Sequence, residues 1–171
     1  MIIEFFVPGL PRPAGSKSAY YIEKIGRAVV TDANPKAKDW KAAVAVAARA
    51  ALPPKFRLLT GRIEVTATFF LPRPRGHYGT GKNADKIKDS ALIDPLTKPD
   101  LLKIMRGTED ACTGIVWRDD AQIADEHTLK HYDDNHCVGV EVRIEATPST
   151  FAELKAQRAR QLVAAAQEEA R

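Results

Sequence analysis

The sequence predicts an α+β fold, because segments with the period of β-strands and segments with the period of α-helices recur along one chain of 171 residues. The strongest strand signals are Arg62–Leu71 and Cys137–Ala146, in which apolar and polar residues alternate. Apolar residues at helical spacing occupy 35–52 and 99–114. This length suits one domain with an appendage. We therefore expect a domain over 1–147 and a C-terminal helix over 148–171.

The N-terminal part predicts a strand, a basic loop, a hairpin and a helix. Ile2–Val7 is a short apolar run before Pro-Gly, which is typical of a buried strand, and the Pro/Gly-rich stretch 10–17 follows it as a loop. Two extended runs, Ala19–Ile25 and Arg27–Val30, are divided by Gly26 and indicate a hairpin. Asn34-Pro35 then supplies an N-cap and a first helical residue for a helix that ends near residue 52.

The C-terminal part predicts a second helix, two strands and a last helix. Pro99 opens the second helix and Gly114 closes it, with a core-facing stripe of Leu101, Met105, Thr108 and Cys112. A turn at 118–120 precedes a strand from about residue 121. After the strand at 137–146, the stretch 151–171 is rich in Ala, Gln, Arg and Glu and indicates a helix with a thin apolar stripe.

Composition narrows the class of protein. No stretch of about 18 apolar residues exists, so we expect no membrane span. The two cysteines, Cys112 and Cys137, form neither a disulfide framework nor a CxxC zinc motif. The N-terminus lacks the pattern of a secretory signal. We expect a soluble protein in the reducing cytoplasm.

Charge is divided unevenly along the chain. Residues 1–106 hold 19 Lys and Arg against 9 Asp and Glu, whereas residues 107–171 hold 7 against 13. A basic part favours a polyanion such as nucleic acid. The acidic part is either a solvated surface or a metal-binding cluster beside a DNA track. The segment 72–97 has no clear period and carries many bases, so we expect a long flexible loop that either tracks a DNA backbone or is merely solvent-exposed.

Three aspartates are the candidate chemical groups. Asp100 stands at the expected start of a helix, where the alternative is an ordinary N-cap, and Asp119-Asp120 occupy a turn, where the alternative is an Asp-rich turn without function. Carboxylates that converge repel one another unless a cation binds between them. Mg²⁺ takes one or two carboxylates together with waters and phosphate oxygens, and it polarises a phosphodiester. A neighbouring Lys or Arg offsets charge on the phosphate.

In this order, the segments resemble the RusA-type Holliday-junction resolvases over residues 2–145, with the C-terminal helix outside. The most specific part of the resemblance is the series Lys98-Pro99-Asp100, Asp110-Ala111 and Trp117–Ile123. Supporting segments are Phe6–Pro13 with Gly15-Ser16-Lys17, the strand Ile63–Leu71, and Thr113-Gly114.

The resemblance implies a single mixed α/β domain with a central, mostly antiparallel sheet packed by helices. It also implies a homodimeric endonuclease that depends on Mg²⁺, with Mn²⁺ as a substitute, in the cytoplasm of a bacterial or phage-infected cell. Such an enzyme cuts four-way DNA junctions by paired nicks in recombination and repair. By position, Asp100, Asp119 and Asp120 match the catalytic and metal-binding acids, and Arg106 matches the basic catalytic residue. The residues expected to contact DNA are Arg12, Lys17, Arg73, Arg75, Lys82, Lys86, Lys88, Lys103 and Arg118.

One position departs from the family pattern. The family motif reads KPDxD, but Leu102 stands where its second carboxylate belongs. Leucine offers no oxygen to a metal, so water would have to replace the ligand, or Asp94 or Glu109 would have to reach the site. The alternative function is therefore a structure-specific DNA-binding protein that holds branched DNA with weak or no cleavage.

Overall fold

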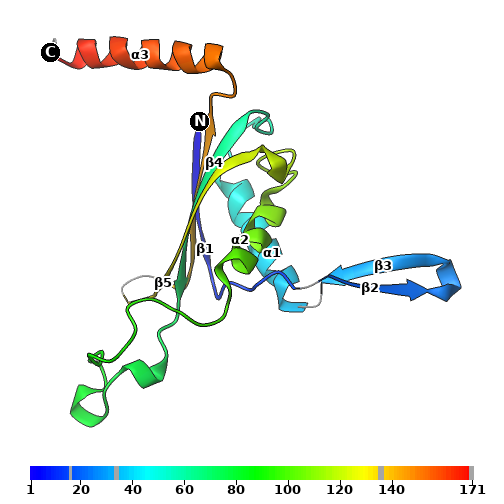
Figure 1. Ribbon diagram of the computed structural model, residues 1–171, viewed down its shortest axis with the longest axis vertical. Coiled ribbons are helices and arrows are strands. Elements are labelled where there is room, and N and C mark those ends of the chain that lie inside the picture. Colours follow the sequence, from blue (N-terminus) through cyan, green and yellow to red (C-terminus); the bar gives the residue numbers. More distant parts are fainter. Residues whose placement is uncertain (16, 33–34, 135–136, 170–171) are drawn as a thin grey trace.

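The computed structural model describes residues 1–15, 17–32, 35–134 and 137–169, and it confirms the α+β fold. A four-stranded sheet in the order β1-β6-β4-β5 forms the centre (Figure 1). β1 and β4 each pair antiparallel with β6, and β4 pairs parallel with β5, so the sheet is mostly antiparallel. The bounds are Ile2–Pro8 for β1, Arg62–Leu71 for β4, Ile123–Tyr132 for β5 and Gly139–Thr147 for β6.

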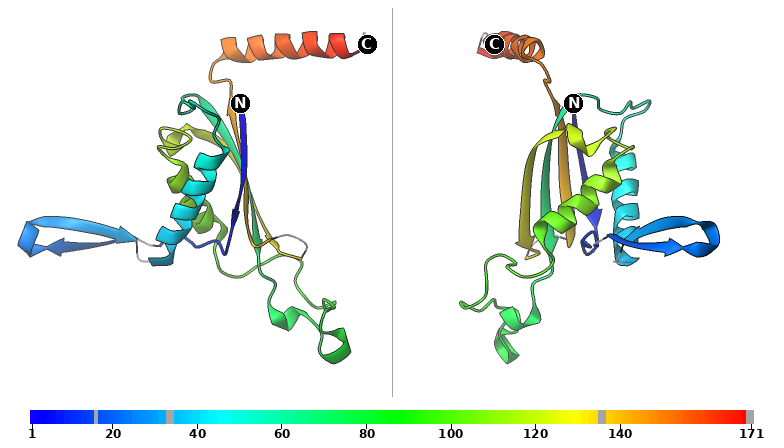
Figure 2. Two further views of the ribbon diagram at one scale, coloured as in Figure 1. Left: turned by 180° about the vertical axis from the view of Figure 1, so that it is seen from behind. Right: turned by 45° about the vertical axis from the view of Figure 1, so that its right-hand side comes forward.

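Two helices, α1 (Pro35–Ala51) and α2 (Leu101–Cys112), cover one face of the sheet, and the other face is left open (Figure 2). The alternation in β4 explains this layering, because Ile63, Val65, Ala67 and Phe69 are buried while the residues between them are more exposed. Gly139 begins β6 so close to the backbone of β1 that a Cβ would overlap the carbonyl of Val7. The core lies between this face and the helices.

The hairpin expected around Gly26 is present, as β2 (Lys17–Ile22) and β3 (Arg27–Asp32). Gly26 has a φ of 61°, in the left-handed region that favours glycine. The hairpin projects away from the sheet, and residues 72–97, which we call the arm, project in another direction (Figure 1). Both projections therefore reach beyond the body of the domain.

The last helix, α3 (Phe151–Glu169), follows β6 and extends away from the sheet (Figures 1 and 2). Its start is a capping box, since Thr150 Oγ1 accepts from the Glu153 amide at 3.2 Å and the Glu153 carboxylate accepts from the Thr150 amide at 3.2 Å. Phe151 and Leu162 remain exposed. Among the described residues, no helix is both long enough and apolar enough to cross a bilayer.

The helix and strand limits differ slightly from those expected. α1 begins at Pro35 as predicted, whereas Asn34 lies outside the described residues. α2 is shorter at both ends than the predicted 99–114, because Asp100 takes an extended conformation and Thr113 ends the helix. β5 begins at Ile123 rather than 121, because a three-residue 3₁₀ turn, Asp120–Gln122, intervenes. That turn is the centre of the site described next.

Candidate active site

The segment that leads into the acidic turn is held by a buried tryptophan. Trp117 is 1% exposed, and its indole Nε1 donates to Thr113 Oγ1 at 3.1 Å. One residue earlier, the carbonyl of Val116 accepts from the Leu59 amide at 2.9 Å, which ties the segment to the chain ahead of β4. The turn that follows therefore starts from a fixed point.

Asp119 and Gln122 build the turn by reciprocal capping. Asp119 Oδ1 accepts from the Ala121 amide at 2.9 Å, while Gln122 Oε1 accepts from the amides of Arg118 at 3.0 Å and Asp119 at 3.1 Å. Gln122 Nε2 also donates to the carbonyls of Leu59 and Gly61. One oxygen of Asp119 is thus used to shape the turn, and Asp120 is exposed beside it. Sequence reasoning missed the role of Gln122, although the spacing D-x-x-Q is that of a capping box.

Asp120 belongs to a group of crowded carboxylates. The sequence suggested an acidic cluster in this half of the chain and named Glu109 as a possible ligand, but it did not show which carboxylates lie together. Glu109, in the last turn of α2, is half-buried, and its pKa is raised to about 7. Burial is the largest cause, followed by the charge of Glu126 and a hydrogen bond with it, and then by the charges of Asp120 and Asp110. Asp110 pairs with Lys41 at 2.7 Å. The start of β5 and the end of α2 therefore concentrate negative charge.

Asp100 lies at the other end of α2. It occupies the N-cap position, but its side chain makes no capping bond and instead pairs with Lys103 at 3.0 Å. The hydrogen bond and charge of Lys103 lower the pKa of Asp100, with further help from Lys98 and Lys130. A cavity of about 410 Å³ opens here between Pro13–Gly15 of the N-terminal loop and the segment 98–103.

The two acidic ends are separated because β5 runs antiparallel to α2. The Lys130 ammonium, late in β5, donates to the carbonyls of Thr97 at 3.0 Å and Pro99 at 3.1 Å, whereas Asp120 precedes the start of β5. Along the helix, Asp100 and Glu109 are about 13 Å apart at 1.5 Å per residue.

The expected metal site of Asp100, Asp119 and Asp120 is therefore not assembled within one chain. Among the described residues, no three His, Cys, Asp or Glu side chains are placed to hold a metal ion. The resemblance implied that the three aspartates form one site. The rigid helix between them holds Asp100 away from the other two.

Arg106 lies between the two acidic ends, in the middle of α2. It is exposed, and its Nη2 lies 3.5 Å from the carbonyl of Gly15, at the long limit for a hydrogen bond. Leu102, in the first turn, is 77% exposed. Neither side chain is buried in the core, so both are accessible on the exposed side of α2.

Arg73 does not fit the prediction that it contacts DNA. Its side chain is 5% exposed, and Nε and Nη2 donate to the two carboxylate oxygens of Asp134, each at 2.5 Å. The guanidinium also lies 4.3 Å from the centre of the Tyr132 ring, and its Nη1 donates to the carbonyl of Leu92 at 2.7 Å. The hydrogen bond and charge of Asp134 raise the pKa of Arg73. Arg73 is an anchor for the base of the arm.

The arm has internal structure that its sequence did not reveal. Two 3₁₀ turns, Arg75–His77 and Gly81–Asn83, are joined by backbone bonds from Gly79 to Lys86 and from Lys88 to His77. At its base, His131 and Asp94 pair at 2.7 Å. The C-terminal end of β5 therefore contacts the arm at both of its ends, through Tyr132 and His131.

The other predicted DNA-contacting residues differ in what they already bind. Arg75, Lys82 and Lys86 on the arm and Arg118 beside the acidic turn are exposed. Lys88 is exposed but donates to the carbonyl of Gly76 at 2.9 Å, and Lys103 pairs with Asp100. Arg12 is half-buried, and the side chain of Lys17 lies outside the described ones. Among the residues predicted to contact DNA, the exposed basic side chains are thus concentrated on the arm.

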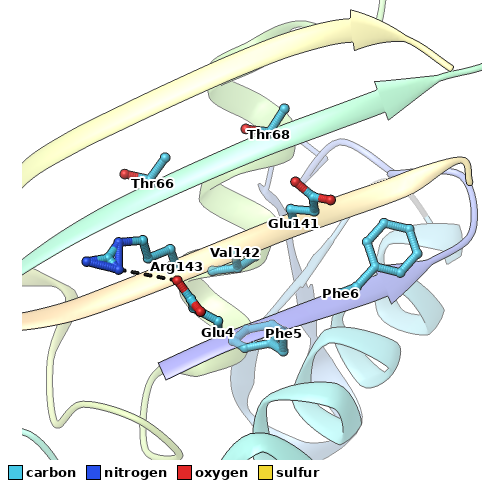
Figure 3. A pocket seen from close by; sticks show the side chains of 8 residues that line it. All are labelled: Glu4, Phe5, Phe6, Thr66, Thr68, Glu141, Val142 and Arg143. Carbon is cyan, nitrogen blue, oxygen red and sulfur yellow. Dashed lines mark hydrogen bonds and ion pairs between the residues drawn. The ribbon is translucent and has the colours of Figure 1, made fainter. Parts of the chain in front are cut away.

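Another cavity lies on the open face of the sheet, away from Asp100, Glu109 and the acidic turn (Figure 3). It measures about 490 Å³ and contains the ion pair between Glu4 and Arg143, at 3.3 Å. Its lining side chains come from β1, β4 and β6, as Figure 3 shows. This hollow therefore contributes nothing to the candidate active site.

Comparison with known proteins identifies a family for this chain. The family model described as "Endodeoxyribonuclease RusA" matches residues 10–145, which include both acidic ends of α2, the acidic turn and the arm. An uncharacterized protein of Bacillus subtilis (strain 168), YqaN, is 29% identical over 108 residues, which are 63% of this chain and 74% of that protein.

Replacing Arg73 by lysine is expected to loosen the base of the arm. Lysine keeps the charge but loses the two-pronged contact with Asp134 and the stacking on Tyr132. A charge-assisted hydrogen bond contributes about 1.5–3 kcal/mol. Its loss should lower the free energy of local opening by that amount, so the amides of 88–97 should exchange at least about tenfold faster. Hydrogen exchange followed by mass spectrometry measures this. The exposed neighbour gives the control Arg75→Lys, and equal exchange in both variants would contradict the anchoring role.

The carboxyl of Glu109 is expected to make stability depend on pH. Its pKa is about 7 in the folded chain against an ordinary 4.5, so between these values the folded chain holds a proton that the unfolded chain releases. The free energy of unfolding therefore falls as pH rises through this window. In EDTA, Glu109→Gln should remove that fall, as measured by urea unfolding at pH 5 and pH 8. The control is Glu141→Gln, at an exposed position of β6, which should keep the fall in stability. An unchanged pH dependence in Glu109→Gln would refute the raised pKa of Glu109.

Proposed function

The chain belongs to the RusA family of endodeoxyribonucleases, and from this membership we propose that it resolves four-way DNA junctions by paired cuts during recombination and repair. The observation that carries the proposal is the acidic turn at 119–120, held by Gln122 next to Glu109 and Glu126. Such a turn presents carboxylate oxygens from a fixed backbone, as phosphodiester chemistry with a metal ion requires.

The carboxylates at this end of α2 are proposed to contribute ligands to a divalent cation, and no three of the described side chains are placed to hold one within a single chain. Burial is the main cause of the raised pKa of Glu109, and the charges of Glu126 and Asp120 raise it further. A cation bound beside these carboxylates would neutralise part of their negative charge. Mg²⁺, or Mn²⁺ in its place, would polarise the scissile phosphate and lower the pKa of a bound water. Asp120, which is exposed, would be a ligand in this proposal, and the exposed Arg106 would offset charge on the phosphate.

Binding of branched DNA is supported by the two projections. Arg75, Lys82 and Lys86 are exposed on the arm, and Lys24 and Arg27 are exposed at the tip of the hairpin. The arm and the hairpin, which carry these basic residues, project in different directions from the sheet (Figure 1). This arrangement suits a DNA ligand whose duplex arms diverge. The hairpin bases were not among the residues expected from sequence.

We further propose that the active form is a homodimer in which Asp100 of one copy meets Asp120 of the other. The two acids lie at opposite ends of α2 in a single chain, and Asp100 is exposed. A two-fold axis crossing the middle of α2 would place the N-terminal end of one helix beside the C-terminal end of the other. Two equivalent sites would then face the two symmetric strands of a junction.

A junction-binding protein with weak cleavage is the second candidate, and Leu102 is the observation that favours it. Its side chain is 77% exposed where a family carboxylate is expected, so the first turn of α2 lacks one oxygen ligand. Both candidates share the DNA-binding surface and differ only in chemistry.

The substitution Asp120→Asn is expected to abolish nicking of a labelled four-way junction in Mg²⁺. A bound metal supplies several kcal/mol of transition-state stabilisation, so the rate should fall by more than about a hundredfold while binding persists. Asp39→Asn, at an exposed position of α1, is the matched control and should cut like the wild type. A wild-type protein that binds junctions but cuts only after Leu102→Asp would favour the binding candidate. Undiminished cutting by Asp120→Asn would remove Asp120 from the chemistry.

Mixing two inactive variants tests the shared site. A heterodimer of Asp100→Asn and Asp120→Asn has one site with both substitutions and one site with neither. Random exchange should therefore restore about a quarter of the wild-type nicking sites, with one nick per junction. Cutting is followed on junctions labelled on each strand after the variants are unfolded and refolded together. Sites confined to single chains would leave the mixture inactive, and a monomeric mass by light scattering would also count against the dimer.

A further inference from the structure

The segment that returns from the arm to α2, residues 92–97, has its backbone fixed at several points. Arg73 Nη1 donates to the carbonyl of Leu92 at 2.7 Å, Asp94 pairs with His131 at 2.7 Å, and Lys130 donates to the carbonyl of Thr97 at 3.0 Å. Pro95 is buried among them. We call residues 92–97 the return segment; Figure 1 shows it running to the first turn of α2.

Two large apolar side chains of the return segment nevertheless face solvent. Ile93 is 85% exposed and Leu96 is 76% exposed, although Asp94 and Pro95 between them are turned inward. A single exposed apolar residue is ordinary on a protein surface. A pair held outward by a backbone that is bonded on both sides cannot turn into the core, so the pair is presented to a partner.

The surroundings of this pair indicate what the partner is. Lys98 and Lys103 are exposed just beyond the return segment, next to the cavity at Asp100. Lysines favour phosphate groups, and apolar side chains favour the faces of bases. An apolar protein surface would not need these lysines, whereas nucleic acid offers both groups wherever its bases are accessible.

We propose that Ile93 and Leu96 insert between base pairs at the branch point of DNA and so recognise the junction itself. This inference rests on the proposed function and adds to it how branched DNA is distinguished from a plain duplex. Leu and Ile act as wedges that partly unstack base steps, and unstacking costs least where pairing is already interrupted. The fixed backbone of the return segment suits this role because the side chains do not have to be ordered on binding.

The proposal is tested with a four-way junction that carries 2-aminopurine beside the branch point, titrated in EDTA. The fluorescence of this base rises when it is unstacked. Wild-type protein should raise it on the junction and not on a linear duplex of the same sequence. The double variant Ile93→Ser with Leu96→Ser should not raise the fluorescence. Its ratio of affinities for junction over duplex should be about tenfold lower than that of the wild type. Leu162→Ser, at a 73% exposed position of α3, is the matched control and should behave like the wild type.

The outcomes separate this inference from the nuclease proposal. If the wild type cuts junctions but leaves the 2-aminopurine stacked, or if the double variant unstacks it normally, the wedge is refuted and the nuclease stands. If the double variant becomes monomeric by light scattering with unchanged fluorescence per bound protein, the pair contacts a second copy and the wedge is again refuted. A wild type that shows no preference for branched DNA overturns both proposals.

Discussion

The packing of one short helix against the sheet decides how the chemical groups of this protein are distributed. α2 buries Ile104, Met105, Thr108 and Cys112, each exposed by 1% or less, so it can neither rotate nor slide without opening the core. With that face fixed, residues 100 and 109 are held at the two ends of a rigid rod. The chemistry at each end then depends on what the neighbouring segments bring to it.

The two ends of α2 have opposite electrostatic character. At the N-terminal end, lysines surround Asp100 and lower its pKa, so this carboxylate is already neutralised by its own chain. At the C-terminal end, burial and then the charges of neighbouring carboxylates raise the pKa of Glu109 to about 7. A helix dipole also disfavours acids at its C-terminal end. In the proposed function, a cation would therefore neutralise more charge at the acidic turn than at Asp100.

Periodicity predicted the elements well because burial on one face imposes a regular pattern on the sequence. β4 has the predicted limits, and the stripe from Met105 to Cys112 is buried. The pattern fails where a contact joins distant segments through single polar groups. Arg73 reads as one more base in a basic loop, yet Asp134 lies 61 residues away and buries it. Glu109 likewise reads as a surface residue, because its neighbour Glu126 is brought in only by the path of β5.

The exposed leucine at position 102 connects the two features that distinguish this chain. Packing does not explain it, since the side chain is 77% exposed. Local helix energetics do not explain it either, because the first turn of a helix favours a carboxylate. Leu102 lies at the end of α2 reached by the return segment, which already presents Ile93 and Leu96. In the two proposals made above, an apolar side chain at position 102 would add to the surface offered to exposed nucleobases, whereas the aspartate of the family motif would offer an oxygen to a metal ion.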